Sequence, residues 1–261
     1  MNLSLTNKTA VVCGSTQGIG LATAIEISKL GAACVLMARN EAALQEAIGQ
    51  LNNSYNQQHR YLVADFNKPE MVKEVIENFV AQHPVHILIN NTGGPAGGPI
   101  TEATEDAFIN TFNRHLICNH ILTKAVMVSM KAAGYGRIIN IISTSVKIPL
   151  ANLGVSNTIR GAVASWSKTM ANELGQFNIT VNNVLPGATN TNRLKSIIEN
   201  NAVKKDSSVD AIEEEMKKEI PMKRFAEASE IANVVAFLAS PAASYINGVN
   251  IPVDGGRTGS M

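Results

Sequence analysis

The sequence predicts an α/β protein built on a doubly wound parallel sheet. Short apolar segments rich in β-branched residues recur along the chain, and segments with helical spacing separate them. Strands that are apolar throughout and alternate with helices indicate a parallel sheet covered on both faces. Right-handed crossovers then wind the sheet in two directions, and ligands bind beyond the carboxyl ends of its strands.

Seven segments are predicted strands, in the order in which they occur. The first four read "TAVVC", "ACVLMA", "YLVAD" and "ILINN", and each is short, apolar and followed by turn residues or a helical pattern. The last three read "RIINIIS", "ITVNNVL" and "GVNIPVD". The predicted strands therefore span residues 9–13, 33–38, 61–65, 87–91, 137–143, 179–185 and 248–254.

One segment departs from this alternation. Residues 192–223 are charged and weakly apolar, with helical spacing and no strand. We expect either a helical substrate flap over the ligand cleft or a solvated surface excursion. The whole chain, 1–261, is otherwise predicted to form one domain, a size that open α/β folds often reach.

Composition excludes several classes of function. The chain is 45% hydrophobic and 16% charged with a net charge of +1, so it predicts a large core and no binding to nucleic acid or to an anionic membrane. The N-terminus lacks a signal-peptide pattern and no segment is apolar enough to span a bilayer, which predicts a cytoplasmic protein. Small molecules remain as partners.

Cysteine and histidine positions give no sign of a metal site. Cys13, Cys34 and Cys118 are odd in number and form no C-x-x-C motif, so we expect buried thiols and neither a disulfide nor a zinc site. His115 and His120 are five residues apart and would lie on different faces of a helix. We therefore predict no metal.

A glycine-rich turn follows the first predicted strand. The segment "CGSTQGIG" places Gly14, Gly18 and Gly20 between that strand and a helix, with Ser15 and Ile19 among them. Glycines there allow backbone N–H groups to approach a pyrophosphate at the helix N-terminus. This position favours a dinucleotide site over a simple turn.

The end of the second predicted strand bears on the choice of cofactor. It reads Ala38-Arg39-Asn40, with no carboxylate at the strand tip, although Glu41 follows. An arginine there suits the 2′-phosphate of NADP, so we expect NADP, with NAD as the alternative. Asp65 either accepts from the adenine amino group or caps a turn, and Phe66 beside it is assigned to the same end of the cofactor.

Five motifs in order, "CGSTQGIG", "NNTGG", "NIIS", "VNNVLPGATNT" and "GVNIPVDGG", resemble the short-chain dehydrogenase/reductase family over almost the whole chain. The pattern is most similar to 3-oxoacyl-carrier-protein reductases. The resemblance implies a Rossmann fold, hydride transfer between NADP and a carbonyl or alcohol, and a homotetramer. It implies cofactor contacts at Asn90, Asn91, Gly93, Pro186, Gly187, Thr189 and Thr191.

The family works through an Asn, Ser, Tyr, Lys tetrad, and three of the four positions differ here. Ser143 matches the family serine, whereas Ser156 falls at the tyrosine and Arg160 at the lysine. His115 falls where the asparagine is expected. The active-site helix therefore lacks the family's proton donor.

The replacements change what the site can do. Ser156 is shorter and far less acidic than a phenol with a pKa of about 10, so it would need a bridging water to pass a proton. Arg160 keeps a positive charge and can bind ribose hydroxyls, but it cannot relay protons near neutrality. His115 either exchanges protons with the substrate through water or is a packed helix histidine.

Two functions remain open at this point. The first is an NADP-dependent oxidoreductase acting on small ketones or acyl thioesters, in which Ser143 polarises the oxygen and the proton takes an atypical route. The second is a catalytically silent NADP(H)-binding sensor or subunit. Hydrolysis with Ser156 as nucleophile is excluded, because "GVSNT" lacks the second glycine of a nucleophile elbow and no histidine follows it. The small residues at 161–165 suit close helix packing, either within the chain or in a tetramer.

Overall fold

A computed structural model of the chain describes residues 1–259. Its centre is a seven-stranded, fully parallel sheet in the order β3-β2-β1-β4-β5-β6-β7. The strand order reverses between β1 and β4, which confirms the doubly wound sheet. The strands are β1 (Thr9–Cys13), β2 (Ala33–Ala38), β3 (Arg60–Val63), β4 (Ile87–Asn90), β5 (Gly136–Ile141), β6 (Ile179–Pro186) and β7 (Asn250–Val253).

The first two strands match their predicted limits, and others end earlier than predicted because polar groups take local partners. Asp65 leaves β3 to accept the backbone N–H of Asn67 at 3.0 Å. Ser143 leaves β5 and accepts the N–H of Ser145 at 3.1 Å. Side chains that cap turns compete with the ladder in this way.

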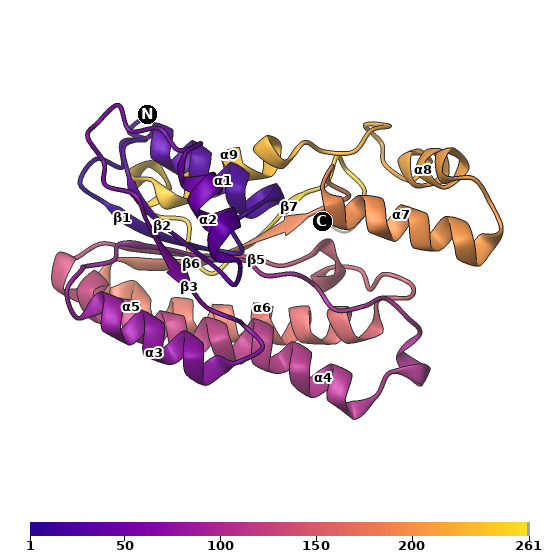
Figure 1. Cartoon of the computed structure of the whole chain (residues 1–261), viewed down its shortest axis with the longest axis horizontal. Helices are drawn as coiled ribbons and strands as arrows, with labels where there is room; N and C mark the ends of the chain where they lie inside the picture. The colour runs from indigo at the N-terminus through magenta and orange to yellow at the C-terminus, as the bar shows by residue number, and fades with distance from the viewer. Residues whose placement is uncertain (260–261) are drawn as a thin grey trace.

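Helices cover both faces of the sheet (Figure 1). One layer contains α1 (Gly18–Lys29), α2 (Glu41–Ile48) and α9 (Ala228–Ala239), and the opposite layer contains α3 (Pro69–Val80), α5 (Cys118–Ala133) and α6 (Gly154–Leu174). Because successive strand side chains point to opposite faces, Val12 joins the first core and Val11 the second. Both valines are completely buried.

The helix before β5 contains an irregular turn. α4 (Glu105–Phe112) continues into α5 through a π-helical turn, η2 (Asn113–Ile117). Such a turn inserts an extra residue per turn and often marks a functional site. His115 lies within it. Short 3₁₀ turns complete the chain at η1 (Ile100–Glu102), η3 (Thr144–Val146), η4 (Gly175–Phe177) and η5 (Pro241–Ala243).

A row of asparagine side chains crosses four neighbouring strands. Asn90 donates to Asn140 at 2.8 Å, Asn140 to Asn183 at 2.9 Å, and Asn183 to Asn250 at 2.7 Å. The same residues are paired in the sheet register from β4 to β7. The carboxamides pair along the row inside the molecule, where an unpaired amide is costly, and of the row's buried side-chain atoms only Oδ1 of Asn90, at the β4 end, lacks a hydrogen-bond partner among the described residues.

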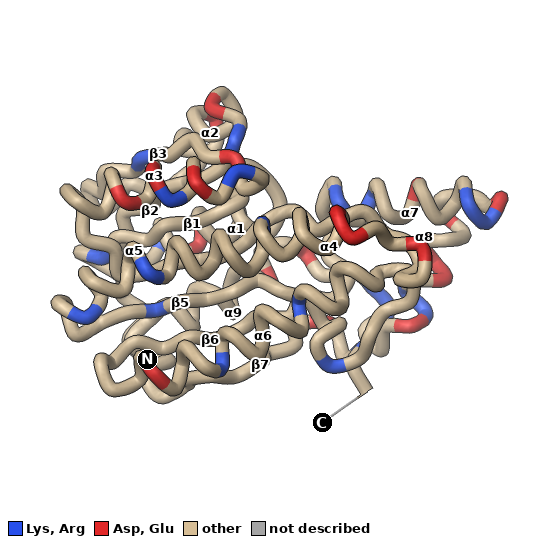
Figure 2. Tube along the Cα trace, turned by 90° about the horizontal axis from the view of Figure 1, so that it is seen from below, with Lys and Arg blue, Asp and Glu red and all other residues tan. Residues whose placement is uncertain are grey.

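The segment predicted as a flap or a surface excursion is a pair of helices, α7 (Asn192–Lys205) and α8 (Val209–Lys218), which extends beyond the ends of the strands (Figure 1). The pair has a small apolar cluster of its own, and its surface is densely charged (Figure 2). The cluster contains Leu194, Ile198, Ala202, Ile212, Ile220 and Phe225.

Two further predictions concern the cysteines and the membrane-spanning character of the helices. The three cysteines are buried and unpaired, which confirms their assignment as buried thiols. Along 1–259, none of the helices combines the length and the apolar character that crossing a bilayer requires.

Candidate active site

A cleft of about 390 Å³ opens at the carboxyl ends of β1, β4, β5 and β6, beneath α7. Sequence motifs that are far apart in the chain meet on its walls. Of the predicted site residues, the cleft is lined by Gly14, Gly18, Ile19, Asn91, Gly93, Ser143, Ser156, Arg160, Pro186, Gly187, Thr189 and Thr191.

The glycine loop forms the wall nearest α1. Gly14 has a φ of 57°, and a Cβ there would lie 2.7 Å from the Asn91 carbonyl oxygen. The Asn91 amide donates to the Cys13 and Gly14 carbonyls, at 3.2 Å each, and so fixes the loop against β4. A Cβ at Gly20 would collide with the Gly14 carbonyl. The loop conformation therefore requires these glycines.

The first turn of α1 is suited to an anion. No side chain caps it, and its first turn contains no acidic residue. The free N–H groups and the positive end of the helix dipole therefore remain for a phosphate, as a dinucleotide pyrophosphate would require. Ile19 lines the cleft beside this turn.

Ser15 supports the loop from behind. Its side chain is fully buried, and its hydroxyl accepts the N–H of Met37 at 3.1 Å. It does not line the cleft. We infer that Ser15 fixes the loop to β2 through this contact with Met37, which is distant in sequence.

The residues assigned to the adenine end follow β2 and β3, outside the walls of the main cleft. Arg39 is exposed, and no carboxylate among residues 1–259 forms an ion pair with it. Glu41, the nearest acid in sequence, accepts the Tyr61 hydroxyl at 2.9 Å. Asp65 holds Asn67 in a turn, and Phe66 is buried.

Three predicted catalytic residues meet on one wall of the cleft. Ser143 ends β5, while Ser156 and Arg160 lie one turn apart on α6. Arg160 is only 8% exposed, and its Nη1 donates to the Ile141 carbonyl at 2.7 Å. Burial, and then the charge of Arg193, lower the pKa of the Arg160 guanidinium to about 10, so it stays charged at neutral pH.

His115 lies behind that wall and does not line the cleft. It is 2% exposed, and its Nε2 has no hydrogen-bond partner among the described residues. Burial, and then the charges of Arg160 and Arg114, hold the pKa of His115 well below its usual value, while a backbone contact with Gly93 acts in the opposite direction. The imidazole is therefore neutral at pH 7.

The opposite wall is formed by the segment after β6. The Thr189 hydroxyl donates to the Gly187 carbonyl at 3.0 Å, and Thr191 caps α7 by accepting the Leu194 N–H at 3.3 Å. A Cβ at Gly187 would lie 2.7 Å from the Asp254 Cα, so glycine allows β6 and β7 to stay close together. Both threonines keep a defined position beside the cleft.

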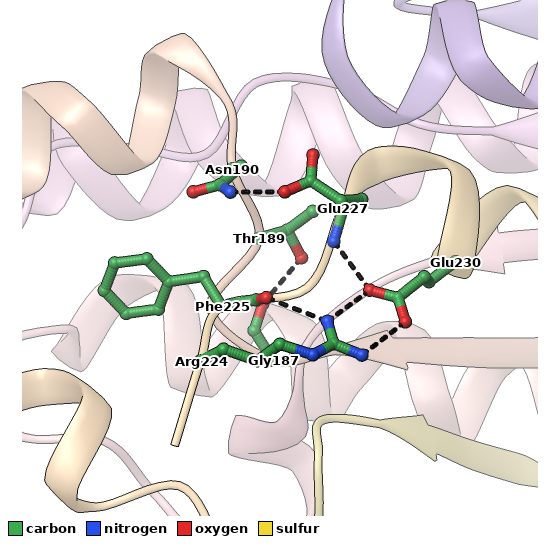
Figure 3. Close-up of polar contacts among 7 residues, drawn as sticks. All are labelled: Gly187, Thr189, Asn190, Arg224, Phe225, Glu227 and Glu230. Atoms are coloured by element: carbon green, nitrogen blue, oxygen red, sulfur yellow. Dashed lines mark hydrogen bonds and ion pairs between the residues drawn. The ribbon is translucent and has the colours of Figure 1, made fainter. Parts of the chain in front are cut away.

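A clip at the start of α9 holds this wall from outside (Figure 3). Arg224 binds the Glu230 carboxylate with two nitrogens at 2.6 and 2.7 Å. The same carboxylate accepts the Glu227 N–H at 2.9 Å, and Glu227 accepts the Asn190 amide at 2.6 Å. We call these four residues the α9 clip.

Sequence reasoning missed several residues of the cleft, most notably Arg193. It lies in the first turn of α7, lines the cleft, and donates from Nη2 to the Pro95 carbonyl. Its position just after the "GATNT" motif was the available signal. Arg257 and Met216 also line the cleft.

Comparison with known proteins agrees with this geometry. The family model described as "Enoyl-(Acyl carrier protein) reductase" matches residues 14–258. The 3-oxoacyl-[acyl-carrier-protein] reductase FabG of Pseudomonas aeruginosa is 33% identical over 259 residues, which cover 97% of this chain and 98% of the relative. The NADPH-dependent reductase BacG of Bacillus subtilis is 30% identical and covers 98% of this chain and 100% of its own.

A solved structure shows the same fold. The L-sorbose reductase of Gluconobacter frateurii, complexed with NADPH and L-sorbose, superimposes with a TM-score of 0.93 at 30% identity and covers 100% of both chains. The residues that the family model matches include the glycine loop and the segment after β6, both of which line the cleft. The chain belongs to the short-chain dehydrogenase/reductase family.

Proposed function

We propose that the protein is an NADP-dependent reductase that passes hydride between nicotinamide and a carbonyl or alcohol carbon, with a proton route that uses no tyrosine. The observation that carries the proposal is the meeting of Ser143, Ser156 and Arg160 opposite Pro186 and Gly187 in the cleft behind the glycine loop. The reacting carbon of the substrate and the hydride donor would be held between these two walls of the cleft.

The choice of NADP is supported by the charges at the end of β2. Arg39 is exposed and forms no ion pair with a carboxylate of residues 1–259, while Glu41 is held by the Tyr61 hydroxyl. A guanidinium in this position can bind the 2′-phosphate, and no acid at the strand tip opposes it. The name of the NADPH-dependent BacG relative and the NADPH complex of the sorbose reductase support the same choice.

Bound cofactor supplies the hydride, and the chain's own residues orient the substrate and move the proton. The Ser143 hydroxyl donates to the substrate oxygen, and the buried Arg160 charge stabilises negative charge that develops there. The short side chain of Ser156 leaves room for a water that carries the proton. None of the four tyrosines, all within 1–259, lines the cleft.

His115 is the titratable group behind this wall, and we propose that it communicates with the water past Gly93 and Arg160. As a neutral imidazole it suits the acceptance of a proton during alcohol oxidation better than the donation of one during reduction. The substrate is a small ketone or an acyl thioester, enclosed by α7 and α8 acting as a flap.

The family resemblance supports a proposal for assembly and location. We propose a cytoplasmic homotetramer in which the small-residue face of α6 packs against another subunit. A Cβ at Gly161 would meet nothing within 4 Å, so this face has room for a partner helix. Sedimentation or light scattering of the purified protein tests the assembly.

A catalytically silent NADP(H)-binding protein is the second candidate. It is favoured by the loss of the phenol and the lysine from α6, combined with the neutral state of His115. Cofactor binding does not separate the two candidates, because both need the cleft. Turnover does.

The experiment follows oxidation of NADPH and NADH with a panel of ketones, sugar ketones and 3-oxoacyl thioesters. Wild type is compared with the double variant Ser156→Tyr, Arg160→Lys, and Thr169→Tyr on the exposed face of α6 serves as control. The reductase proposal expects wild-type turnover that prefers NADPH. A turnover rate in the double variant that exceeds the wild-type rate by a factor of roughly 10²–10⁴ would instead support the silent protein.

A further inference from the structure

Two guanidinium groups line the cleft without a carboxylate partner. Arg160 comes from α6 and Arg193 from α7, and neither forms an ion pair within the described chain. The third arginine of the lining, Arg257, is paired with Glu219. None of the described residues that line the cleft is an aspartate or a glutamate.

The two groups converge on one place in the cleft. A Cβ built on Gly94 would lie 3.9 Å from Nη2 of Arg160 and 3.9 Å from Nη2 of Arg193. The two nitrogens therefore lie within about twice that distance of each other, above a residue that has no side chain. The space beside Gly94 is open to both.

Most of their donors are not used by the protein. Each guanidinium has five N–H donors in a planar fork. Among the described residues, Arg160 uses Nη1 on the Ile141 carbonyl, and Arg193 uses Nη2 on the Pro95 carbonyl. These backbone contacts fix the direction of each side chain and leave its charge uncompensated.

Without an anion, the arrangement places the buried charge of Arg160 near the charge of Arg193, which is exposed to solvent. Arg160 is more than nine-tenths buried, and the charge of Arg193 together with burial lowers its pKa to about 10. Like charges that repel in a partly apolar cleft become favourable contacts once a carboxylate or phosphate lies between them. Arginine forks match both anions in geometry.

The phosphates of the cofactor can bind at residues other than Arg160 and Arg193. The free N-terminal turn of α1 suits the pyrophosphate, and Arg39 suits the 2′-phosphate. Arg160 and Arg193 instead meet near Ser143 and Ser156, on the side assigned to the substrate. Resting on the proposed function, we propose that Arg160 and Arg193 bind an anionic group, a carboxylate or a phosphate ester, of the oxo substrate.

The first test uses substrate pairs that differ in charge. The 2-oxo and 3-oxo carboxylic acids are each compared with their methyl esters, and dihydroxyacetone phosphate is compared with dihydroxyacetone. Turnover with NADPH is measured, and calorimetry measures the affinity of each compound for the protein saturated with NADP⁺, where no reduction occurs. Tighter binding of an acid than of its ester identifies a carboxylate, and tighter binding of the phosphorylated ketone identifies a phosphate.

The second test removes one charge. Arg193→Gln is compared with Arg193→Lys, which keeps the charge, and with Lys195→Gln, which removes an exposed charge from the same helix outside the cleft. Arg193→Gln should weaken binding of the anionic compound roughly 10- to 100-fold. The affinities for the uncharged compound of the pair and for NADPH should stay within about twofold of the wild-type values. Arg193→Lys should recover part of the lost affinity for the anion. Lys195→Gln should change none of the affinities for the anion, the uncharged compound and NADPH.

The outcomes separate this inference from the proposed function. Equal binding of charged and neutral partners overturns the anion site, even if both are reduced. Loss of NADPH affinity in Arg193→Gln, with no effect on the anion, overturns it as well and assigns the arginines to the cofactor. Selective anion binding without any turnover supports the site and counts against the reductase.

Discussion

The ionisation of His115 is determined by the residues packed around it. A histidine on a helix with an ordinary pKa of about 6.5 would be half charged near neutral pH. Here burial, Arg160 and Arg114 all favour the neutral ring. The sequence left open whether His115 exchanges protons or is a packed helix histidine, because the charges that decide its state are brought together only by folding.

This difference in pKa makes stability depend on pH. The unfolded chain takes up a proton at His115 as the pH falls through about 6.5, whereas the folded protein does not, so acid favours unfolding. The free energy of unfolding should fall below pH 6.5 by up to about 1.4 kcal/mol per pH unit at this site. Urea unfolding between pH 5 and 8 measures it.

The variant His115→Asn should lose the part of the pH dependence of the unfolding free energy that His115 contributes. His120→Asn, at an exposed position on α5, should retain it. An equal slope in wild type and His115→Asn would mean that the pKa of the ring is the same in the folded and the unfolded protein. In that case burial and the neighbouring arginines would not determine its ionisation.

Residues of the site differed in how readily the sequence predicted them. Ser143, Ser156 and Arg160 were placed together by the family resemblance, and all three line the cleft because the strand and the helix that carry them are regular. Ser15 was assigned to the cofactor, and the structure adds a contact with Met37 on the neighbouring strand that the sequence did not indicate. Arg193 was missed, because its contacts with Pro95 and the space over Gly94 join segments about a hundred residues apart.

At the scale of elements, the α9 clip joins α9 to the wall of the cleft that follows β6. Arg224 holds the pKa of Glu230 at about 2, and the Glu227 N–H acts in the same direction. The carboxylate is therefore ionised in the folded protein at a pH where the unfolded chain is already protonated. Its stabilising effect is present above the ordinary pKa of about 4.5 and is lost as the pH falls toward 2.

We expect Glu230→Gln to lower the melting temperature at pH 7, with the difference from wild type vanishing as the pH falls through this range. Differential scanning calorimetry at a series of pH values measures it, and Glu214→Gln on the exposed face of α8 serves as control. A difference that stays constant down to pH 3 would show that the carboxylate charge contributes nothing.

The elements themselves followed from the sequence because hydrophobic runs and turn residues are local signals. The π-helical turn η2 did not, since nothing in "FNRHLIC" distinguishes it from a regular helix. Its extra residue is accommodated by packing between α4, α5 and α6, which only the folded molecule brings together.

On the scale of the whole molecule, the α7–α8 pair has a small core of its own and only part of its surface meets the cleft. An element with few contacts to the main core opens more readily than the sheet. We expect amide hydrogen exchange in 192–223 to slow when NADPH and a substrate bind, because the flap then closes on them. Exchange in β1 and β4 should stay unchanged.

A flap that exchanges at the same rate in free and bound protein, while the glycine loop becomes protected, would contradict this expectation. The pair would then be a fixed wall of the cleft. The strand pattern predicted the sheet, but no sequence signal distinguished a moving helical pair from a fixed one, since motion depends on contacts across the cleft.

The asparagine row from β4 to β7 makes four positions depend on one another. Three amides of the row donate in the same direction, toward β7, so replacing Asn140 or Asn183 leaves a donor on one side and an acceptor on the other without a partner. The effect of a substitution at one of these positions therefore depends on the residues beside it in the row. Four strands from distant parts of the chain are coupled through one run of hydrogen bonds, so the effects of two substitutions within it on stability should not add.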